Sequence, residues 1–259
     1  MKIENYGVGE RCAEAMRRFF LAEEKGELPR SVRRLIILPI PTSRDGVHLT
    51  ATDLTVSEVL HGAGEGDVVA GYAIPSSIKE ILASRGAWVY DASEDEEFLL
   101  ANANLTAIGT VGYILTELSR APSELRFGVV GYGRIGALLV RYLLFFGAKV
   151  RVYTTKNLTR MELCECGVDT VLTSRDFEKI DIDGIDCLIN TAPTSLAETF
   201  PYGKVPDGVR VIELASGDNF SGVSGVVRLP SIPEKFYGKS AGVEYYRAIK
   251  KYIDGVFVQ

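Results

Sequence analysis

The segment Gly131-Tyr132-Gly133-Arg134-Ile135-Gly136 decides the fold of this chain. It follows the apolar run 125–130, which predicts a buried strand, and it opens the helix-compatible stretch 135–146. A second predicted strand, 149–153, comes at the distance that a strand-helix-strand unit requires. Here the first glycine permits a tight turn, the second lets backbone approach a pyrophosphate, and the third lets helix and strand pack closely. The segment therefore predicts a dinucleotide-binding turn, with the helix N-terminus facing the anion.

The end of the second predicted strand indicates which dinucleotide is bound. Sites for NAD usually carry an acidic residue there, which accepts hydrogen bonds from the ribose 2′-hydroxyl. Residues 150–156 contain no acid, whereas their hydroxyls and Lys156 suit a 2′-phosphate. This favours NADP, with NAD as the alternative, although the same side chains also suit a solvated surface. The expected contacts are Tyr153, Thr154, Thr155, Lys156, Arg134 and Arg160.

Two loops are expected at the nicotinamide end of the same site. Thr191, Ala192 and Pro193 follow the predicted strand 186–189, and Ala215 and Ser216 follow the predicted strand 209–214. Ligands of open parallel sheets bind beyond the carboxyl ends of the strands, so both loops are expected to line the cofactor. The alternative is that they are ordinary turns.

The rest of the chain also alternates helices and short apolar strands. Upstream, strands are predicted at 35–38, 68–72 and 87–90, and helices at 12–25, 77–84 and 97–119. Downstream, helices are predicted at 158–166 and 240–253, and a strand at 169–172. No strand with a glycine turn is predicted ahead of Cys12. The pattern predicts an α/β protein of two parallel-sheet units joined near residue 121.

Composition excludes several classes of protein. Hydrophobic residues make up 46% and charged residues 24%, which indicates a folded core rather than disorder. The net charge of −5 argues against nucleic-acid binding. No apolar run approaches the roughly 20 residues of a membrane span, and the N-terminus does not look like a signal peptide. The four cysteines fit neither a disulfide framework nor a metal site. A cytoplasmic enzyme without a bound metal is expected.

The segment 39–46, at the end of a predicted buried strand, is the candidate substrate loop. Ser43 and Arg44 suit a carboxylated substrate, with Arg44 forming a bidentate pair. The alternative is a proline-stiffened loop with a solvated arginine. The two histidines are His48 and His61, so the late histidine of an ordinary 2-hydroxyacid dehydrogenase is missing.

Several segments, in this order, make the chain similar to the A subunit of dipicolinate synthase. They are 38–46, Asn102 to Thr110, Gly131 to Gly136, Val211 to Ser216, Leu229-Pro230 and Lys239-Ser240-Ala241-Gly242. The resemblance implies a flavodoxin-like domain (1–100), a linking helix (101–120), a Rossmann domain (121–235) and a C-terminal helix (236–259) returning to the first domain, with a cleft between the domains.

The same resemblance implies an activity. The expected reaction, in sporulation, is the oxidation of a dihydrodipicolinate-level product of the lysine pathway to pyridine-2,6-dicarboxylate, with NADP as hydride acceptor. A dicarboxylate substrate binds cationic groups and N–H donors. Ser43, Arg44 and Lys239 are therefore expected to hold it, with Thr106 on the substrate side. A flavoprotein-like B subunit is the expected partner, and a homo-oligomer is a further expectation.

Two departures from the family pattern keep other functions open. Leu105 and Ile108 stand where the family pattern has a proline and a glutamate. One alternative is therefore a non-catalytic, NAD(P)-binding regulatory or scaffold subunit. The other is an NADP-dependent reductase of another small carboxylated substrate.

Overall fold

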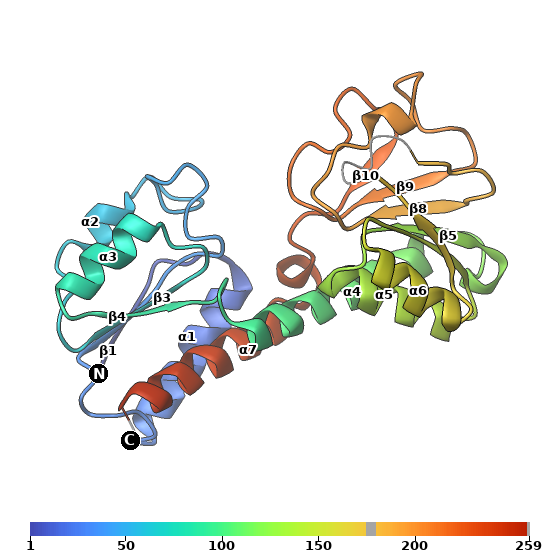
Figure 1. Ribbon diagram of the computed structural model, residues 1–259. Coiled ribbons are helices and arrows are strands. Elements are labelled where there is room, and N and C mark those ends of the chain that lie inside the picture. The colour runs from blue at the N-terminus through green and yellow to red at the C-terminus, as the bar shows by residue number, and fades with distance from the viewer. Residues whose placement is uncertain (175–179, 258–259) are drawn as a thin grey trace. The chain divides into compact units, whose positions relative to one another are not determined.

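The computed structural model describes residues 1–174 and 180–257. The chain forms two compact units: unit 1 comprises Met1–Asn102 and Pro233–Gln259, and unit 2 comprises Ala103–Ile232. Each unit contains one parallel sheet, of four strands in unit 1 and six in unit 2 (Figure 1). The α/β fold class expected from the sequence is confirmed.

The sheet of unit 1 has the strand order β1-β2-β3-β4, with every neighbouring pair parallel. Its elements are β1 (Lys2–Asn5), α1 (Gly9–Glu24), β2 (Arg34–Ile37), α2 (Val56–Leu60), β3 (Asp67–Gly71), α3 (Ser76–Ser84) and β4 (Trp88–Asp91). The start of α4 (Glu96–Glu117) and nearly all of α7 (Ile232–Phe257) complete the unit. All five residues of β3 are buried, as expected for a strand covered on both faces.

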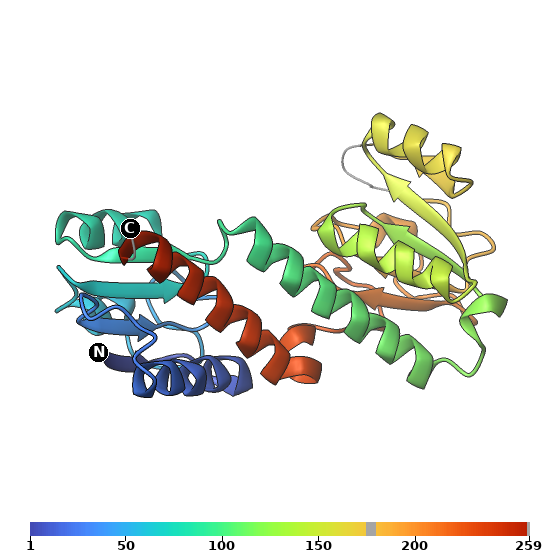
Figure 2. The same ribbon diagram turned by 90° about the horizontal axis from the view of Figure 1, so that it is seen from below.

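Helices cover both faces of this sheet (Figure 2). On one face, Leu35 and Val68 pack against α1, α7 and the first turns of α4. On the other face, Ile36 and Val69 pack against α2 and α3. The C-terminal helix contacts α1, which confirms its expected return to the first unit: the rings of Phe19 and Tyr246 are 4.7 Å apart.

Strand β1 corrects the expectation that no strand precedes Cys12. It pairs in parallel with β2, with Ile3 opposite Leu35. The sequence signal was weak because β1 is an edge strand whose residues all remain partly exposed, so only Ile3 needed to be strongly apolar. Gly7 and Gly9 then lead from β1 into α1.

Helix α7 begins at Ile232, well before the expected start at Ser240. Its backbone leaves helical geometry at Tyr237 (φ −138°, ψ 40°), so a short first turn precedes the long helix that covers the sheet.

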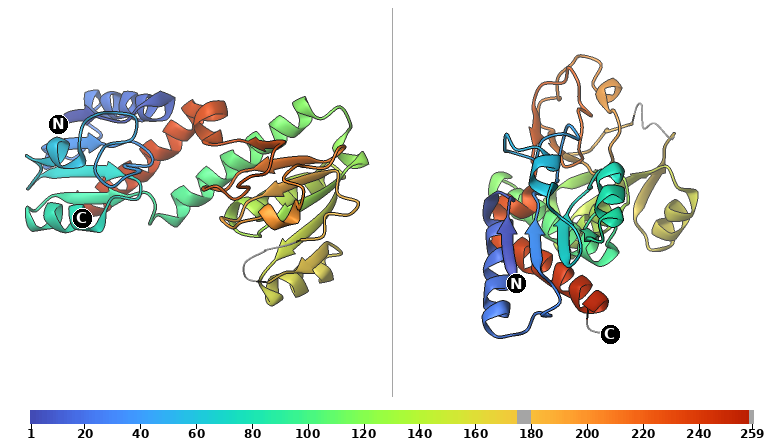
Figure 3. Two further views of the ribbon diagram at one scale, coloured as in Figure 1. Left: turned by 90° about the horizontal axis from the view of Figure 1, so that it is seen from above. Right: turned by 90° about the vertical axis from the view of Figure 1, so that its left-hand side faces the viewer.

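Unit 2 has the strand order β10-β9-β8-β5-β6-β7, also fully parallel (Figure 3). The chain order therefore reverses between the neighbouring strands β5 and β8, as it does in dinucleotide-binding Rossmann sheets. Its elements after α4 are η1 (Pro122–Glu124), β5 (Arg126–Val130), α5 (Arg134–Phe145), β6 (Lys149–Thr154), α6 (Asn157–Glu165), β7 (Asp169–Leu172), β8 (Cys187–Asn190), η2 (Ala197–Thr199), β9 (Arg210–Glu213) and β10 (Val226–Arg228).

The two faces of the unit 2 sheet are covered differently. Helices α4, α5 and α6 pack on one face, where Val111, Leu139 and Leu163 bury Val129 and Val152. Irregular segments and η2 cover the other face, with buried side chains that include Leu196, Phe200 and Phe220.

Helix α4 corrects the expectation that no segment reaches membrane-spanning length. Among the described helices, it alone is long and apolar enough to cross a membrane, with a mean hydropathy of 1.4 over its most apolar window. Its asparagines and threonines interrupt the apolar run without lowering the average enough. Ala107, Val111 and Ile114 are nonetheless buried against the unit 2 sheet, so α4 has the packing of a core helix.

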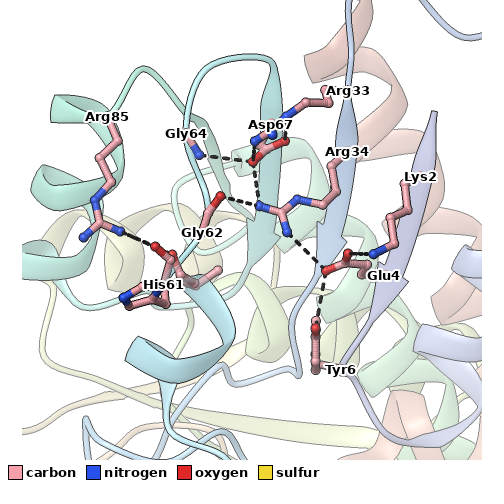
Figure 4. Close-up of polar contacts among 11 residues, drawn as sticks. Lys2, Glu4, Tyr6, Arg33, Arg34, His61, Gly62, Gly64, Asp67 and Arg85 are labelled. Carbon is pink, nitrogen blue, oxygen red and sulfur yellow. Dashed lines mark hydrogen bonds and ion pairs between the residues drawn. The ribbon is translucent and has the colours of Figure 1, made fainter.

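An ionic cluster joins the amino ends of the unit 1 strands (Figure 4). The buried carboxylate of Asp67 accepts hydrogen bonds from Arg33 at 2.6 Å and Arg34 at 2.8 Å, and one from the backbone N–H of Gly64. Burial acts to raise the pKa of Asp67, yet these hydrogen bonds hold it below its usual value. Ligands of parallel sheets bind at the opposite, carboxyl edge, so we interpret this cluster as structural.

Candidate dinucleotide-binding site

The glycine turn of unit 2 lies at the carboxyl end of β5, beside the point where strand order reverses. Gly131 has a φ of 87°, a conformation that favours glycine. A Cβ on Gly136 would lie 2.4 Å from the carbonyl oxygen of Gly131, so the close approach of α5 to the turn requires glycine there. Tyr132, between them, is partly buried against the core.

Gly133 provides the space that a phosphate group needs. It is the N-cap of α5, with a φ of −86°, and as a glycine it has no side chain to cap the helix. A Cβ built on Gly133 would meet nothing within 4 Å. Ile135 lies in the first turn, beside the exposed Arg134. An open N-terminus on a helix of 12 residues fits a pyrophosphate.

The end of β6 corrects one expected cofactor contact. Tyr153 is fully buried on the face covered by irregular segments, and its hydroxyl donates a hydrogen bond to the carbonyl oxygen of Asp181. Its side chain is therefore part of the core and cannot touch a nucleotide. The error arose because both faces of this strand are buried, so the sequence pattern does not separate core positions from strand-end positions.

The other expected contacts at the end of β6 and in α6 differ in exposure. Thr154 is only 3% exposed, and its hydroxyl oxygen accepts a hydrogen bond from the backbone N–H of Lys156 at 3.2 Å. Thr155 is partly exposed, and Lys156 is exposed at the start of α6. Arg160, one turn further on, donates weakly to Asn157 at 3.4 Å. Thr155, Lys156 and Arg160 are therefore the side chains here that suit a 2′-phosphate.

The first of the two expected nicotinamide-side loops is tied directly to the glycine turn. Thr191 donates hydrogen bonds from its hydroxyl and from its backbone N–H to the carbonyl oxygen of Val130, at 2.8 and 2.9 Å. A Cβ on Gly131 would meet the Thr191 hydroxyl at 3.0 Å and the Ala192 Cβ at 3.1 Å. Pro193 follows and is exposed. The loop after β8 thus borders the turn.

The second loop depends on a buried glutamate that the sequence reasoning missed. Glu213 ends β9 and is 4% exposed. It accepts hydrogen bonds from the Asn190 side chain at 3.1 Å and from the backbone N–H of Ala215 at 2.8 Å. Ser216 is exposed beside it. The available signal was a polar residue ending each of two apolar strands, which places both at one edge of the sheet.

Burial raises the pKa of Glu213, and it outweighs the opposing hydrogen bonds from Asn190 and Ala215. Asn190 also donates to the carbonyl oxygen of Ala192, so the pair connects the two loops beside the glycine turn. We interpret Glu213 as a positioning residue for these loops.

The candidate substrate loop lies in unit 1, after β2. Ser43 donates to Asp45 at 3.1 Å and accepts from the backbone N–H of Gly46 at 2.9 Å, so it orders the loop itself. Asp45 in turn bonds His48 at 2.8 Å, which raises the pKa of His48. Arg44 is exposed and makes no hydrogen bond or ion pair within the described part of the chain.

The two remaining substrate-side candidates lie in different units. Thr106 is on α4 in unit 2 and is 7% exposed. Lys239 is on α7 in unit 1 and is exposed. Ser43 and Arg44 share unit 1 with Lys239, whereas the glycine turn belongs to unit 2.

Comparison with known sequences gives partial matches. No family model matches the chain. A reductase from Strychnos sp, 18-hydroxynorfluorocurarine reductase, is 34% identical over 99 residues, covering 37% of this chain. The match spans 27% of that relative, so the chain corresponds to about a quarter of its length.

Comparison with solved structures covers both units. The A subunit of dipicolinate synthase from Bacillus halodurans has a TM-score of 0.74 and 18% identity, covering 97% of each chain. Its counterpart from Bacillus subtilis gives the same TM-score and identity, over 99% of this chain and 96% of that one. An L-alanine dehydrogenase has a TM-score of 0.55 and 13% identity, over 87% and 81%. At these identities the likeness shows the fold alone: two α/β units, each built on a parallel sheet, the second of them Rossmann-like.

Proposed function

We propose that this chain is an NADP-dependent dehydrogenase that forms pyridine-2,6-dicarboxylate from a dihydrodipicolinate-level precursor. The observation that carries the proposal is the likeness to the A subunit of dipicolinate synthase, which runs through both units and covers 97% of each chain. A shared Rossmann unit alone would favour any dehydrogenase. The likeness extends to unit 1 as well, and its TM-score of 0.74 against 0.55 for the L-alanine dehydrogenase supports the choice of this kind of enzyme.

The cofactor side of the proposal rests on unit 2. Gly133 and the start of α5 would hold the pyrophosphate, and Lys156 with Arg160 would hold the 2′-phosphate. When bound, NADP supplies the hydride acceptor. The dihydro ring loses a hydride and a proton, and the gain of aromaticity favours the step.

The substrate side rests on the exposed cations of unit 1. A dicarboxylate carries two negative charges at neutral pH, and arginine pairs with carboxylates in a bidentate manner. Arg44 and Lys239 are both exposed. We assign them to the substrate carboxylates, with Ser43 ordering the Arg44 loop.

The match to a reductase supports a second candidate function, that of an NADP-dependent reductase. The segment similar to 18-hydroxynorfluorocurarine reductase covers 37% of this chain. An NADP-dependent reductase of another small carboxylated substrate would use the same turn and the same cations. It would reduce its substrate without any flavoprotein. The remaining parts of the proposal are a partner, which is a flavoprotein-like B subunit, and action in the cytoplasm during sporulation.

A coupled assay tests the proposal. Dihydrodipicolinate synthase, pyruvate and aspartate semialdehyde generate the precursor in place, and terbium luminescence reports dipicolinate. The purified chain is added with NADP⁺ or NAD⁺, with and without a flavoprotein B subunit, and an enzyme-free mixture sets the background from air oxidation. Luminescence above background that requires both the chain and a nucleotide supports the proposal. Nucleotide binding without product would favour a non-catalytic subunit or another substrate.

A further inference from the structure

The start of helix α1 in unit 1 holds a carboxylate from the far end of the chain. Glu234, in the first turn of α7, accepts hydrogen bonds from the backbone N–H of Glu10 at 2.6 Å and from that of Arg11 at 3.3 Å. The start of a helix of 16 residues binds anions through its unpaired N–H groups and its dipole. An anion site is therefore formed, and a side chain of the protein occupies it.

The backbone at this point leaves room for the carboxylate. Gly9 has a φ of 87°, and a Cβ built on it would lie 2.2 Å from Oε1 of Glu234. Any other residue at position 9 would fill the space that the carboxylate occupies. The turn from β1 to α1 thus provides the same features as the glycine turn of unit 2, a helix N-terminus with a glycine beside it.

Arg11 provides a second, independent sign of a ligand. The residue is only 6% exposed, and its Nε has no hydrogen-bond partner among the described residues. One Nη donates to Asn102 at 3.1 Å, whereas Nε lies 3.8 Å from the nearer oxygen of Glu234, beyond hydrogen-bond reach. A buried guanidinium is costly unless its N–H groups are satisfied. Glu234 therefore accepts hydrogen bonds from the N–H groups at the start of α1 but leaves the Nε of Arg11 without one.

Glu234 lies where its carboxylate can move away from the N-terminus of α1. Its side chain is 31% exposed, and it stands on the short first turn of α7. The non-helical Tyr237 separates this turn from the long part of the helix, whose Tyr245 and Ile249 are fully buried in unit 1. Moving the first turn would therefore leave the packing of the long helix intact.

The N-terminus of α1 lies at the edge of the unit 1 sheet where parallel sheets bind ligands. Helix α1 starts directly after β1, so its N-terminus lies at the carboxyl edge of the unit 1 sheet. The candidate substrate loop, 39–46, follows β2 at the same edge, and Thr42 in it is hydrogen bonded to Tyr72 after β3.

We propose that Arg11 and the N-terminus of α1 form a binding site for a carboxylate of the substrate, and that Glu234 occupies this site until the substrate displaces it. The incoming carboxylate would bond the N–H groups of Glu10 and Arg11 and the Nε of Arg11. The inference deepens the proposed function, because it rests on a carboxylated substrate, and it adds a residue outside the loop 39–46.

Calorimetric titration of the full chain with dipicolinate, without nucleotide, tests the proposal. Glu234→Gln weakens the internal occupant but preserves its size, so dipicolinate should bind about tenfold more tightly, because hydrogen bonds to a charged carboxylate are stronger than those to a neutral amide. Arg11→Met should weaken binding by a similar factor. The matched controls are Glu244→Gln on α7 and Arg17→Met on α1, which break exposed pairs and should leave affinity unchanged.

The outcomes separate this proposal from the proposed function. Unchanged or weaker ligand binding to folded Glu234→Gln would overturn the site, even if the chain forms dipicolinate in the coupled assay, and so would a failure of both dipicolinate and picolinate to bind any variant. Titration with picolinate, which carries a single carboxylate, provides the second arm. If Glu234→Gln tightens picolinate binding while no dipicolinate is formed in the assay, the carboxylate site is supported and the proposed substrate is wrong. Should Arg11→Met fail to fold, the Glu234→Gln result decides alone.

Discussion

The Asn190 side-chain amide donates to both carboxylate oxygens of Glu213, at 3.1 and 3.2 Å, across the ends of the neighbouring strands β8 and β9. Both residues are buried. Through its remaining contacts the pair fixes the two loops that border the glycine turn. The geometry of these two loops of unit 2 therefore depends on one buried polar pair.

The pair makes stability depend on pH. Burial raises the pKa of Glu213, so the folded state binds this proton more tightly than the unfolded chain does. The free energy of unfolding therefore falls as pH rises from the ordinary pKa of glutamate to that of the folded protein. Glu213→Gln removes this dependence and keeps an oxygen for Asn190 and Ala215. Relative to wild type, the variant should gain stability as pH rises above the ordinary pKa of glutamate, measured by urea unfolding. A constant difference, or a loss with rising pH, would contradict this account.

Gly133→Ala tests the pyrophosphate site. The added methyl group enters space that is open in the protein, so folding stability should not change, whereas the phosphate should be displaced. We expect NADP⁺ affinity to fall by about tenfold or more, or about 1.4 kcal/mol, in a fluorescence titration. Gly62→Ala is the matched control, since a Cβ there also meets nothing within 4 Å. Equal affinities for the two variants would place the pyrophosphate elsewhere.

Lys156→Ala tests the choice of dinucleotide. Removing this exposed cation should weaken NADP⁺ binding by about tenfold, because charge-assisted hydrogen bonds to phosphate contribute roughly 1.5–3 kcal/mol. NAD⁺ binding should not change. Lys149→Ala, at the opposite end of the same strand, is the control. A parallel loss for both nucleotides, or no loss for either, would mean that Lys156 does not contact a 2′-phosphate.

Tyr153→Phe tests the corrected role of this residue. The change removes the hydrogen bond from the hydroxyl to the carbonyl oxygen of Asp181 and leaves the ring in the core. We expect a loss of about 1 kcal/mol in the free energy of unfolding and unchanged NADP⁺ affinity. Weaker nucleotide binding at unchanged stability would restore Tyr153 to the site.

Much of the fold follows from local sequence patterns. The strands β2, β3, β5 and β8 are buried on both faces and are therefore largely runs of apolar residues, and Gly131 and Gly136 in the turn after β5 each meet a separate steric need. Strand β1 was not predicted from the sequence, because an edge strand needs only one apolar side chain, here Ile3, to pair and pack.

The site was less predictable because it depends on contacts between distant residues. Glu213 lies 23 residues from Asn190, and Glu234 lies 224 residues from the N–H group of Glu10 that it bonds. The Gly7-Val8-Gly9 segment before Arg11 was a usable signal, but no strand was predicted ahead of it.

The most direct test of the central claim is the ratio of reduced nucleotide to dipicolinate in the coupled assay. Absorbance of the reduced nicotinamide and terbium luminescence are followed in the same reaction, with the Gly133→Ala variant and an enzyme-free mixture alongside. The account predicts one NADPH for each dipicolinate formed above the background, with both signals reduced in the variant when NADP⁺ is below saturation. Dipicolinate formed at the background rate with no NADPH, while NADP⁺ still binds, would contradict it.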